Sequence, residues 1–435
     1  MNRLYYLKGF LYAALAGILL AGCEYRDPGT ERDGADALAL LAAAVPRIPN
    51  TERKLPLPQT KKQWTVMVYM DGDNNLSPYS AADVAEMMKS GSDANFNILV
   101  LWDTDPDQDQ AGAKNRHGYY YIEKTGAVLL KDTGEVNMGD PATAKDFVAY
   151  AAKNFPAKKY MWVYWNHGGA VDRAVREKGV CWDDTSGGDH LTETEQTDIM
   201  AYAKKKLGRK IDIAGFDACL MATAEIAYQY AGTAAYLVAS EQTIPGDGWD
   251  YRFLSKLKLA PSISARDLGK QILACYKNYY RAQGEEDVTL SLVYLARTGS
   301  LADALDDFTA EAMEGGTGGA PYRNASRGLE MFGLSGGETD SYYTKDLYSY
   351  LRAVAESDGV PDAARERAAA CMELLRDGRF IVSEWHGPRW KDRAYGLAIT
   401  LKHATAVYGQ LDLCEDTGWD EFLNWAKFPD SDYAY

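Results

Sequence analysis

Two apolar segments of the chain end in residues that can carry out covalent chemistry. Residues 160–169 end in Asn-His-Gly-Gly, and residues 211–221 end in Asp-Ala-Cys-Leu-Met. A thiolate attacks a carbonyl carbon, and a nearby imidazole activates the thiol or protonates the leaving amine. If the two segments are neighbouring strands, His167 and Cys219 meet at one edge of a sheet. Each residue alone also has a structural explanation, because a cysteine after a strand is usually a small buried hydrophobe.

The backbone around the pair could stabilise a developing oxyanion. Gly168 allows close approach of a substrate, and the N–H groups of Gly168 and Cys219 are the candidate donors, each contributing about 2.7–4 kcal/mol where such donors have been measured. We expect a helix over residues 222–230 directly after Cys219. A cysteine at a helix N-terminus beside a histidinium has its thiolate favoured by both the dipole and the charge.

Two aspartates are candidates for a substrate pocket. Asp217 precedes Cys219 by two residues and shares its face on an extended strand. A carboxylate there can accept paired hydrogen bonds from a guanidinium or an ammonium group. The alternative for Asp217 is an N-cap of the following helix. Asp247, in Pro-Gly-Asp-Gly, is the second candidate, and its alternative is a turn residue.

The elements that position these residues alternate between strand and helix. Helices are predicted over 80–90, after Asp140-Pro141 through an N-cap and a first-turn proline, and from Thr192 to Gly208 through a capping box with Glu195. Strands joined by helices form a largely parallel sheet covered on both faces, with binding sites at the carboxyl ends of the strands. The apolar runs that predict strands are 64–70, 97–102, 160–165, 211–216, 236–239 and 291–295, and residues 116–124 suggest a side hairpin.

Four motifs, in order along residues 63–297, closely resemble the clostripain family of cysteine peptidases. They are Tyr-Met-Asp-Gly-Asp-Asn-Asn-Leu at 69–76, the two motifs at 166–169 and 217–221, and Ser-Glu-Gln-Thr-Ile-Pro-Gly-Asp-Gly-Trp at 240–249. The resemblance implies an α/β fold, a caspase-like three-layer sandwich shared with gingipains, legumains and separase. It also implies that His167 and Cys219 form the catalytic dyad and that substrates carry a basic residue before the scissile bond, which fits Asp217. Whether arginine or lysine is preferred stays open.

The loop over residues 170–180 is a candidate for self-cleavage. It contains Arg173, Arg176 and Lys178, and the resemblance implies that family members are often activated by an internal cut. The alternative is a solvated charged loop.

The N-terminus predicts a bacterial lipoprotein. Two cations and a short apolar stretch end in Leu-Ala-Gly-Cys at 20–23, as in a signal peptide rather than a spanning helix. We expect residues 1–22 to be removed, Cys23 to carry a lipid, and residues 23–62 to form a tether. The protein then sits on a membrane of the cell envelope, on the periplasmic or the cell-surface side. An uncleaved anchor or a buried N-terminal helix is the alternative.

Composition excludes several classes. A formal charge of −15 argues against nucleic-acid binding, and the five scattered histidines show no zinc spacing. The segment at 71–82 is no EF-hand, because Leu76 and Ala82 occupy the glycine and glutamate positions. We predict no cofactor and no metal ligands. Calcium dependence, implied for some relatives, is left open and unplaced.

Residues 298–435 predict a smaller, mainly helical region without recognisable chemistry. Its Gly-Leu-Ser-Gly-Gly at 333–337 lacks the preceding strand that a serine nucleophile needs. The predicted function is a cysteine endopeptidase that acts on proteins or peptides. The alternative is an inactive surface lipoprotein that uses the same fold as a binding module.

Overall fold

A ten-stranded sheet forms the centre of the protein. The computed structural model describes residues 48–51, 53–105, 116–170, 179–333 and 344–429. The strand order is β1-β5-β4-β3-β2-β6-β9-β10-β11-β13. The strands are β1 (Asn50–Thr51), β2 (Lys62–Gly72), β3 (Phe96–Thr104), β4 (Gly118–Glu123), β5 (Gly126–Asp132), β6 (Ala157–Trp165), β9 (Ile211–Asp217), β10 (Ala234–Ala239), β11 (Thr289–Tyr294) and β13 (Ile381–His386).

The middle of this sheet is parallel, as the sequence predicted. Strands β3, β2, β6, β9 and β10 run in one direction, and the β4–β5 hairpin extends the sheet at one side. The strand β11 differs from the expectation, because it is antiparallel to β10. The helical segment after β10 returns the chain to the end of β10, where Glu241 N donates to Thr289 Oγ1 over 3.0 Å.

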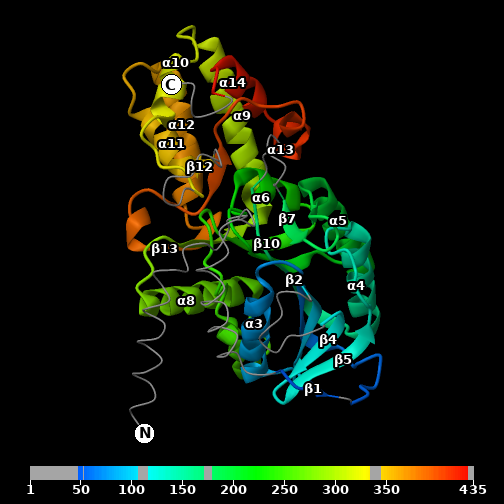
Figure 1. The fold of residues 1–435 in the computed structure, drawn as a ribbon. Helices are drawn as coiled ribbons and strands as arrows, with labels where there is room; N and C mark the ends of the chain where they lie inside the picture. Colours follow the sequence, from blue (N-terminus) through cyan, green and yellow to red (C-terminus); the bar gives the residue numbers. More distant parts are fainter. Residues whose placement is uncertain (1–47, 52, 106–115, 171–178, 334–343, 430–435) are drawn as a thin grey trace, which may run out of the picture.

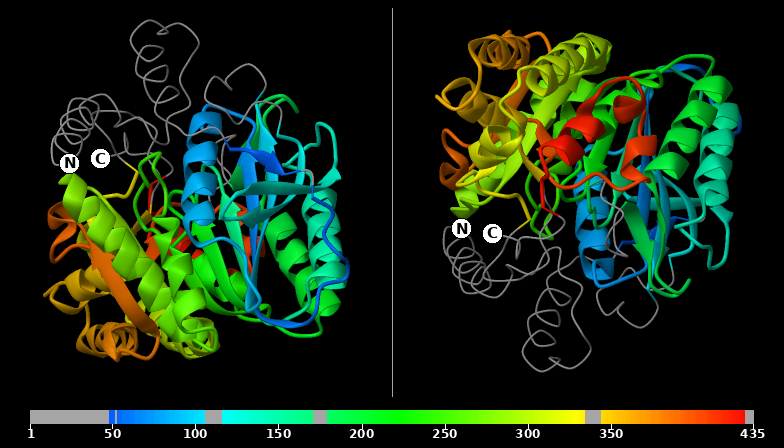
Figure 2. Two further views of the ribbon diagram at one scale, coloured as in Figure 1. Left: turned by 90° about the horizontal axis from the view of Figure 1, so that it is seen from below. Right: turned by 90° about the horizontal axis from the view of Figure 1, so that it is seen from above.

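Helices cover both faces, which gives three layers (Figures 1 and 2). Side chains of β2 alternate between the two cores: Met67 and Tyr69 face one, and Val66 and Val68 face the other. The first core packs against α4 (Pro141–Asn154), α5 (Glu193–Leu207) and α6 (Ala224–Tyr230). The second packs against α3 (Ser77–Ser90), α7 (Ser255–Leu259) and α8 (Ala265–Gln283), with the short helix η1 (Tyr251–Leu254) beside them.

The helix ends predicted from local signals are confirmed. The Asp140 side chain accepts from Ala142 N at the start of α4. Thr192 and Glu195 form the capping box of α5, which ends at Gly208 with φ 68°. These caps satisfy backbone groups that a helix leaves unpaired at its ends.

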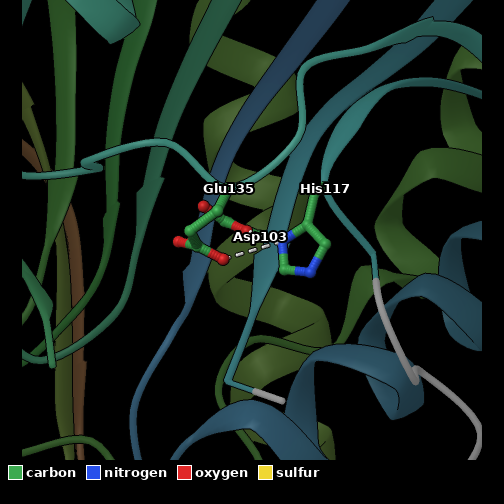
Figure 3. A group of neighbouring side chains, drawn as sticks. All are labelled: Asp103, His117 and Glu135. Atoms are coloured by element: carbon green, nitrogen blue, oxygen red, sulfur yellow. Dashed lines mark hydrogen bonds and ion pairs between the residues drawn. The ribbon is translucent and has the colours of Figure 1, made fainter. Parts of the chain in front are cut away.

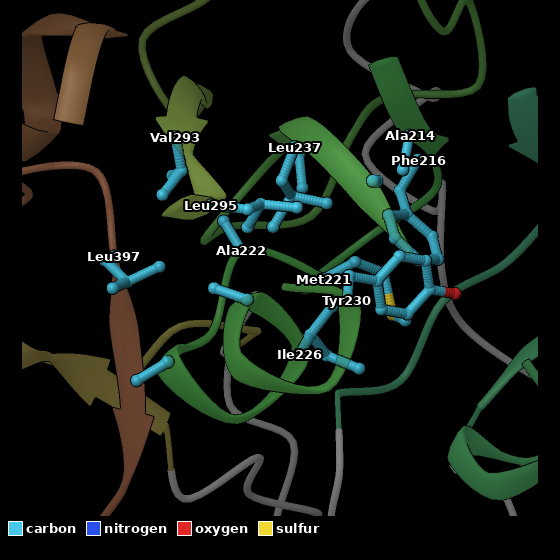
Figure 4. Packing of buried hydrophobic residues seen from close by; sticks show 14 of the residues in the cluster. Ala214, Phe216, Met221, Ala222, Ile226, Tyr230, Leu237, Val293, Leu295 and Leu397 are labelled. Carbon is cyan, nitrogen blue, oxygen red and sulfur yellow. The ribbon is translucent and has the colours of Figure 1, made fainter. Parts of the chain in front are cut away.

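The C-terminal region consists mainly of helices, and it also completes the central sheet. Its helices are α9 (Thr298–Glu314), α10 (Ala320–Ser326), α11 (Leu347–Ala355), α12 (Asp362–Arg376), α13 (Asp412–Glu415) and α14 (Trp419–Trp425). From this region β13 pairs with β11, while β12 (Thr344–Asp346) pairs with β14 (Ala398–Thr400). Leu397 reaches the core cluster that holds Ala222 and Ile226, just beyond Cys219 (Figure 4). The two regions on either side of residue 297 therefore share one central sheet and one hydrophobic core.

The described residues include no helix long and apolar enough to span a membrane. The predicted signal peptide, the lipidation site Cys23 and most of the predicted tether lie outside the described residues.

Candidate active site

Parallel pairing of β6 and β9 brings the two sequence motifs to one edge of the sheet. Trp165 and Asp217 are the last register partners of the two strands, and Asn166 N donates to the Asp217 carbonyl over 3.3 Å. His167 and Cys219 each follow two residues beyond that pair. The predicted meeting of the histidine and cysteine segments is therefore present.

Gly168 lies directly against the backbone of Cys219. A Cβ at position 168 would sit 2.3 Å from the Cys219 carbonyl oxygen and 2.9 Å from its nitrogen. Only a glycine allows this approach, because such contacts are far inside van der Waals distance. Gly168 also bridges to Val180, and Gly169 N donates to the Gly179 carbonyl over 3.0 Å.

His167 has its ring held by Asn75, at the loop between β2 and α3. His167 Nε2 lies 2.7 Å from Asn75 Oδ1. An amide oxygen only accepts, so Nε2 is the donor, and in the neutral ring Nδ1 is left as the proton acceptor. Burial lowers the pKa of His167 from 6.5 to about 4. The imidazole is therefore neutral near pH 7 and able to take a proton.

Asn166 ties the histidine loop to its neighbours. Its Oδ1 accepts from the backbone nitrogens of His167 and Trp182, and its Nδ2 donates to the Asp71 carbonyl over 2.6 Å. The side chain thereby joins the end of β6 to β2 and to β7 (Val180–Asp183), which pairs with β8 (Asp189–Leu191).

Cys219 lies in a tight turn rather than at a helix N-terminus. Leu220, the next residue, has φ 65°, a conformation that non-glycine residues rarely adopt. The helix α6 begins only at Ala224. The prediction that Cys219 stands at a helix N-terminus and is influenced by the helix dipole is therefore wrong. A backbone group contacts the sulfur instead: Ile244 N donates to Cys219 Sγ over 3.1 Å.

Asp217 lines the same small pocket as Cys219. The other lining residues are Leu76, Trp165, Asn166, Ala218, Ile244, Pro245, Gly246 and Gly248. Asp217 Oδ2 accepts from Trp249 N over 3.1 Å and from the Tyr251 hydroxyl over 3.0 Å. Its buried Oδ1 has no hydrogen-bond partner within the described part of the chain. Burial, opposed by those two donors, raises the pKa of Asp217 from 3.8 to about 7.

Asp247 does not line this pocket. Its Oδ2 accepts from the Tyr279 hydroxyl over 2.6 Å, and burial raises its pKa. Arg173, Arg176 and Lys178 lie outside the described residues. The sequence analysis missed the roles of Asn75, Ile244 and Tyr251. Asn75 and Ile244 had a signal, because they stand inside the quoted motifs at 69–76 and 240–249.

Comparisons with known proteins agree with this geometry. The sequence profile of the clostripain family matches residues 68–361. The chain belongs to the clostripain family of cysteine peptidases. It is 26% identical over 414 residues to clostripain from Hathewaya histolytica, covering 79% of this chain and 75% of clostripain.

Solved structures of clostripain-family (C11) proteases share the fold. An inactive zymogen C11 protease from Parabacteroides distasonis aligns with a TM-score of 0.62 and 18% identity, covering 82% of this chain and 99% of its own. A secreted C11 cysteine protease from Bacteroides thetaiotaomicron, solved with an irreversible peptide inhibitor, aligns with a TM-score of 0.62 and 17% identity, covering 82% and 100%. The predicted fold class and the prediction of a cysteine peptidase are thus confirmed.

Proposed function

We propose that this clostripain-family protein is an endopeptidase that cleaves peptide bonds after arginine or lysine, with Cys219 as nucleophile and His167 as general base. The observation that carries the specificity is the position of Asp217, a buried carboxylate in the pocket that Cys219 also lines. Its Oδ1 is buried without a hydrogen-bond partner in the described residues. A guanidinium or ammonium group entering the pocket would supply that partner and the matching charge.

The proposed chemistry uses only groups of the chain and water. Nδ1 of the neutral His167 takes the proton of the Cys219 thiol as sulfur attacks the carbonyl carbon. The oxygen of the tetrahedral intermediate accepts hydrogen bonds from the backbone N–H groups of Gly168 and Cys219. The close packing of Gly168 against the Cys219 backbone supports this assignment. His167 then gives its proton to the leaving amine, and water hydrolyses the thioester.

Asn75 acts in this proposal as a positioning residue. It accepts the Nε2 proton of His167 and so keeps Nδ1 as the basic atom. It does not touch the substrate.

We infer that cleavage in the loop at Arg173, Arg176 or Lys178 activates the enzyme. The hydrogen bond from Gly169 N to the Gly179 carbonyl brings the two ends of this loop together beside Gly168. An uncut loop therefore starts and ends at the active-site edge. The related P. distasonis protease, solved as an inactive zymogen, is consistent with activation by such a cut.

The first test is hydrolysis of matched fluorogenic peptides ending in arginine, lysine, leucine or aspartate. The full chain should cleave only the arginyl and lysyl peptides, and Cys219→Ala should cleave none. Asp217→Asn should lose the basic peptides while an irreversible thiol reagent still labels Cys219. Equal cleavage of the leucyl peptide would refute the role of Asp217.

The binding-module alternative makes the opposite prediction. A binder should not be labelled at Cys219 by an irreversible peptide inhibitor ending in arginine, even after trypsin has cut the loop. Replacing Arg173, Arg176 and Lys178 together tests activation, since continued self-processing in that loop would exclude it.

We also propose that the protein is anchored in the bacterial cell envelope through a lipid on Cys23. The lipobox-like sequence at 20–23 supports this. Metabolic labelling with a radioactive fatty acid should mark the native chain and not Cys23→Ser. Equal labelling of both would refute the anchor.

A further inference from the structure

The edge of the sheet opposite the active site is rich in cations. Strands β2, β6 and β9 are parallel, so they begin at this edge and end where His167 and Cys219 lie. Residues 153–159, 204–210 and 256–266 contain three, five and three Lys or Arg, and no Asp or Glu. The whole chain, in contrast, has a formal charge of −15. We call these three segments the basic edge.

Hydrogen bonds bring the three segments together. Lys159 Nζ, near the start of β6, donates to the carbonyls of Ser262 and Ile263 over 3.1 and 2.8 Å. This contact places the loop between α7 and α8 beside the strand. Arg209, just before β9, donates to the Lys158 carbonyl. The start of β6 therefore contacts both of the other segments, and the cations share one surface.

The basic edge is accessible and contains an exposed apolar side chain. Lys158, Lys205 and Lys258 are all exposed. Leu259 follows Lys258 and has 77% of its surface exposed, against 40% for the next most exposed large hydrophobic residues in the described ranges. Cations beside an exposed leucine are typical of surfaces that bind anionic head groups and place an apolar side chain in the lipid interface. A nucleic acid would bind the cations but leave Leu259 in water.

The active-site edge has the opposite charge. Asp103, at the end of β3, and Glu135, just after β5, flank His117 there (Figure 3). Asp132 ends β5 and Asp140 caps the start of α4, and both are exposed. An anionic surface repels this edge and attracts the opposite one, so the charge distribution favours a single orientation of approach.

The described part of the predicted tether runs along the basic edge. Gln59 N donates to the Asn154 carbonyl over 2.7 Å, and Lys62 N donates to the Pro156 carbonyl over 3.0 Å. Both acceptors belong to the first segment of the basic edge. The chain that would lead from a lipid on Cys23 therefore reaches β2 at the same edge as the cations.

We propose that the basic edge docks on an anionic lipid surface, with Leu259 in the lipid interface and the active site facing away. At about 3.3 Å per strand residue, the run from Lys159 to His167 places the active-site edge about 26 Å further from the lipid. This separation exceeds the Debye length of about 8 Å at physiological ionic strength, so the acidic edge adds little repulsion once the protein has docked. The docking deepens the proposed lipid anchor, on which its cellular setting rests, and it does not depend on peptide cleavage.

Vesicle sedimentation tests the docking without the lipid. Residues 24–435 carrying Cys219→Ala contain the whole described fold, and they lack both the predicted signal peptide and Cys23. Partition is measured on vesicles of phosphatidylcholine with phosphatidylglycerol and on vesicles of phosphatidylcholine alone. We expect binding to the anionic vesicles only. This binding should weaken as salt is added, because salt screens the charges.

A basic-edge variant removes four exposed cations through Lys158→Gln, Lys205→Gln, Lys258→Gln and Arg266→Gln. Each cation near an anionic lipid surface contributes a factor of about five to the partition, so we expect this variant to bind at least about 100-fold more weakly. Leu259→Ser removes no charge and should weaken binding several-fold, because the apolar side chain no longer enters the interface.

The matched control removes the same number of charges from exposed positions outside the basic edge, through Lys131→Gln, Arg281→Gln, Lys391→Gln and Lys427→Gln. It should bind the anionic vesicles as the parent does. Thermal unfolding of both quadruple variants should match that of the parent, since all of the replaced side chains lie at the surface.

Equal partition on neutral and anionic vesicles, or unchanged binding in the basic-edge variant, would overturn the proposal. An equal loss in the control variant would do so too, because it would reduce the effect to net charge. Binding to duplex DNA as tight as to the vesicles, with unchanged binding in Leu259→Ser, would assign the surface to a nucleic acid instead. Failure of fatty-acid labelling at Cys23 would count against the proposed anchor alone, and failure of peptide cleavage against the proposed peptidase activity alone.

Discussion

Asn75 Oδ1 lies 2.7 Å from His167 Nε2, and this contact joins the loop after β2 to the end of β6. It decides which ring nitrogen carries the proton. A residue more than ninety positions from the histidine in sequence therefore sets the chemistry that His167 can perform.

Replacing Asn75 tests this contact. Asn75→Ala should lower kcat for an arginyl peptide by up to about 100-fold, because the ring is no longer held in one orientation, while KM changes little. Asn75→Asp should keep the acceptor and raise the pKa of His167 from about 4, since a carboxylate favours the imidazolium. The acid limb of the kcat–pH profile of Asn75→Asp should therefore move to higher pH. A purely structural role of Asn75 would not cause this shift. Asn324→Ala, on the exposed side of α10, is the control and should match the wild type.

The pH dependence of cleavage should show two groups. Asp217 has its pKa raised to about 7, so it loses its charge as pH falls below 7, and kcat/KM for an arginyl peptide falls with it. His167 becomes protonated only near pH 4 and steepens the loss there. In Asp217→Asn, the rate of alkylation of Cys219 by a neutral reagent, plotted against pH, should show no inflection near pH 7. An inflection that stays near pH 7 in this variant would show that another group titrates there.

Gly168→Ala should abolish activity. The new Cβ would lie 2.3 Å from the Cys219 carbonyl oxygen, so the backbone of one of the two segments must move. Gly299→Ala in α9 is the matched control, because a Cβ there meets no atom within 4 Å beyond its chain neighbours and its own helix backbone. Alanine is also more stable than glycine inside a helix, by up to about 1 kcal/mol. Hydrolysis rates and thermal unfolding of both variants give the comparison. Wild-type rates in Gly168→Ala would contradict the close packing.

The chain ending at residue 297 should not fold by itself. It would lose β13 from the sheet, expose core residues such as Ala222 and Ile226, and lose the partners of two glutamates. Glu225 Oε1 accepts from Thr400 N and the Tyr408 hydroxyl, and Glu241 Oε2 accepts from Gly396 N. Exposing apolar core surface costs about 25 cal/mol per Å². Circular dichroism should show no cooperative unfolding for the fragment and one transition for the full chain. A cooperative fragment would show that the C-terminal region is an independent domain.

The sequence by itself determined the features that depend on neighbours along the chain. The apolar runs predicted the parallel strands, and the caps at Asp140 and Thr192 predicted two helix starts, because these signals act within a few residues. The placement of His167 and Cys219 also followed, since both stand just beyond strands of one parallel sheet, and the carboxyl ends of such strands share an edge.

Only the tertiary structure decided the features that depend on contacts between distant segments. Asp217 and Asp247 both stand in the quoted motifs, and the sequence made both candidates for the substrate pocket. Asp217 lines the pocket, whereas Asp247 accepts a hydrogen bond from Tyr279 on α8. The return of β13 to the sheet likewise joins residues far apart in the chain. Hydrophobic periodicity records whether a residue is buried but not against which segment, so these relationships depend on how the strands and helices pack.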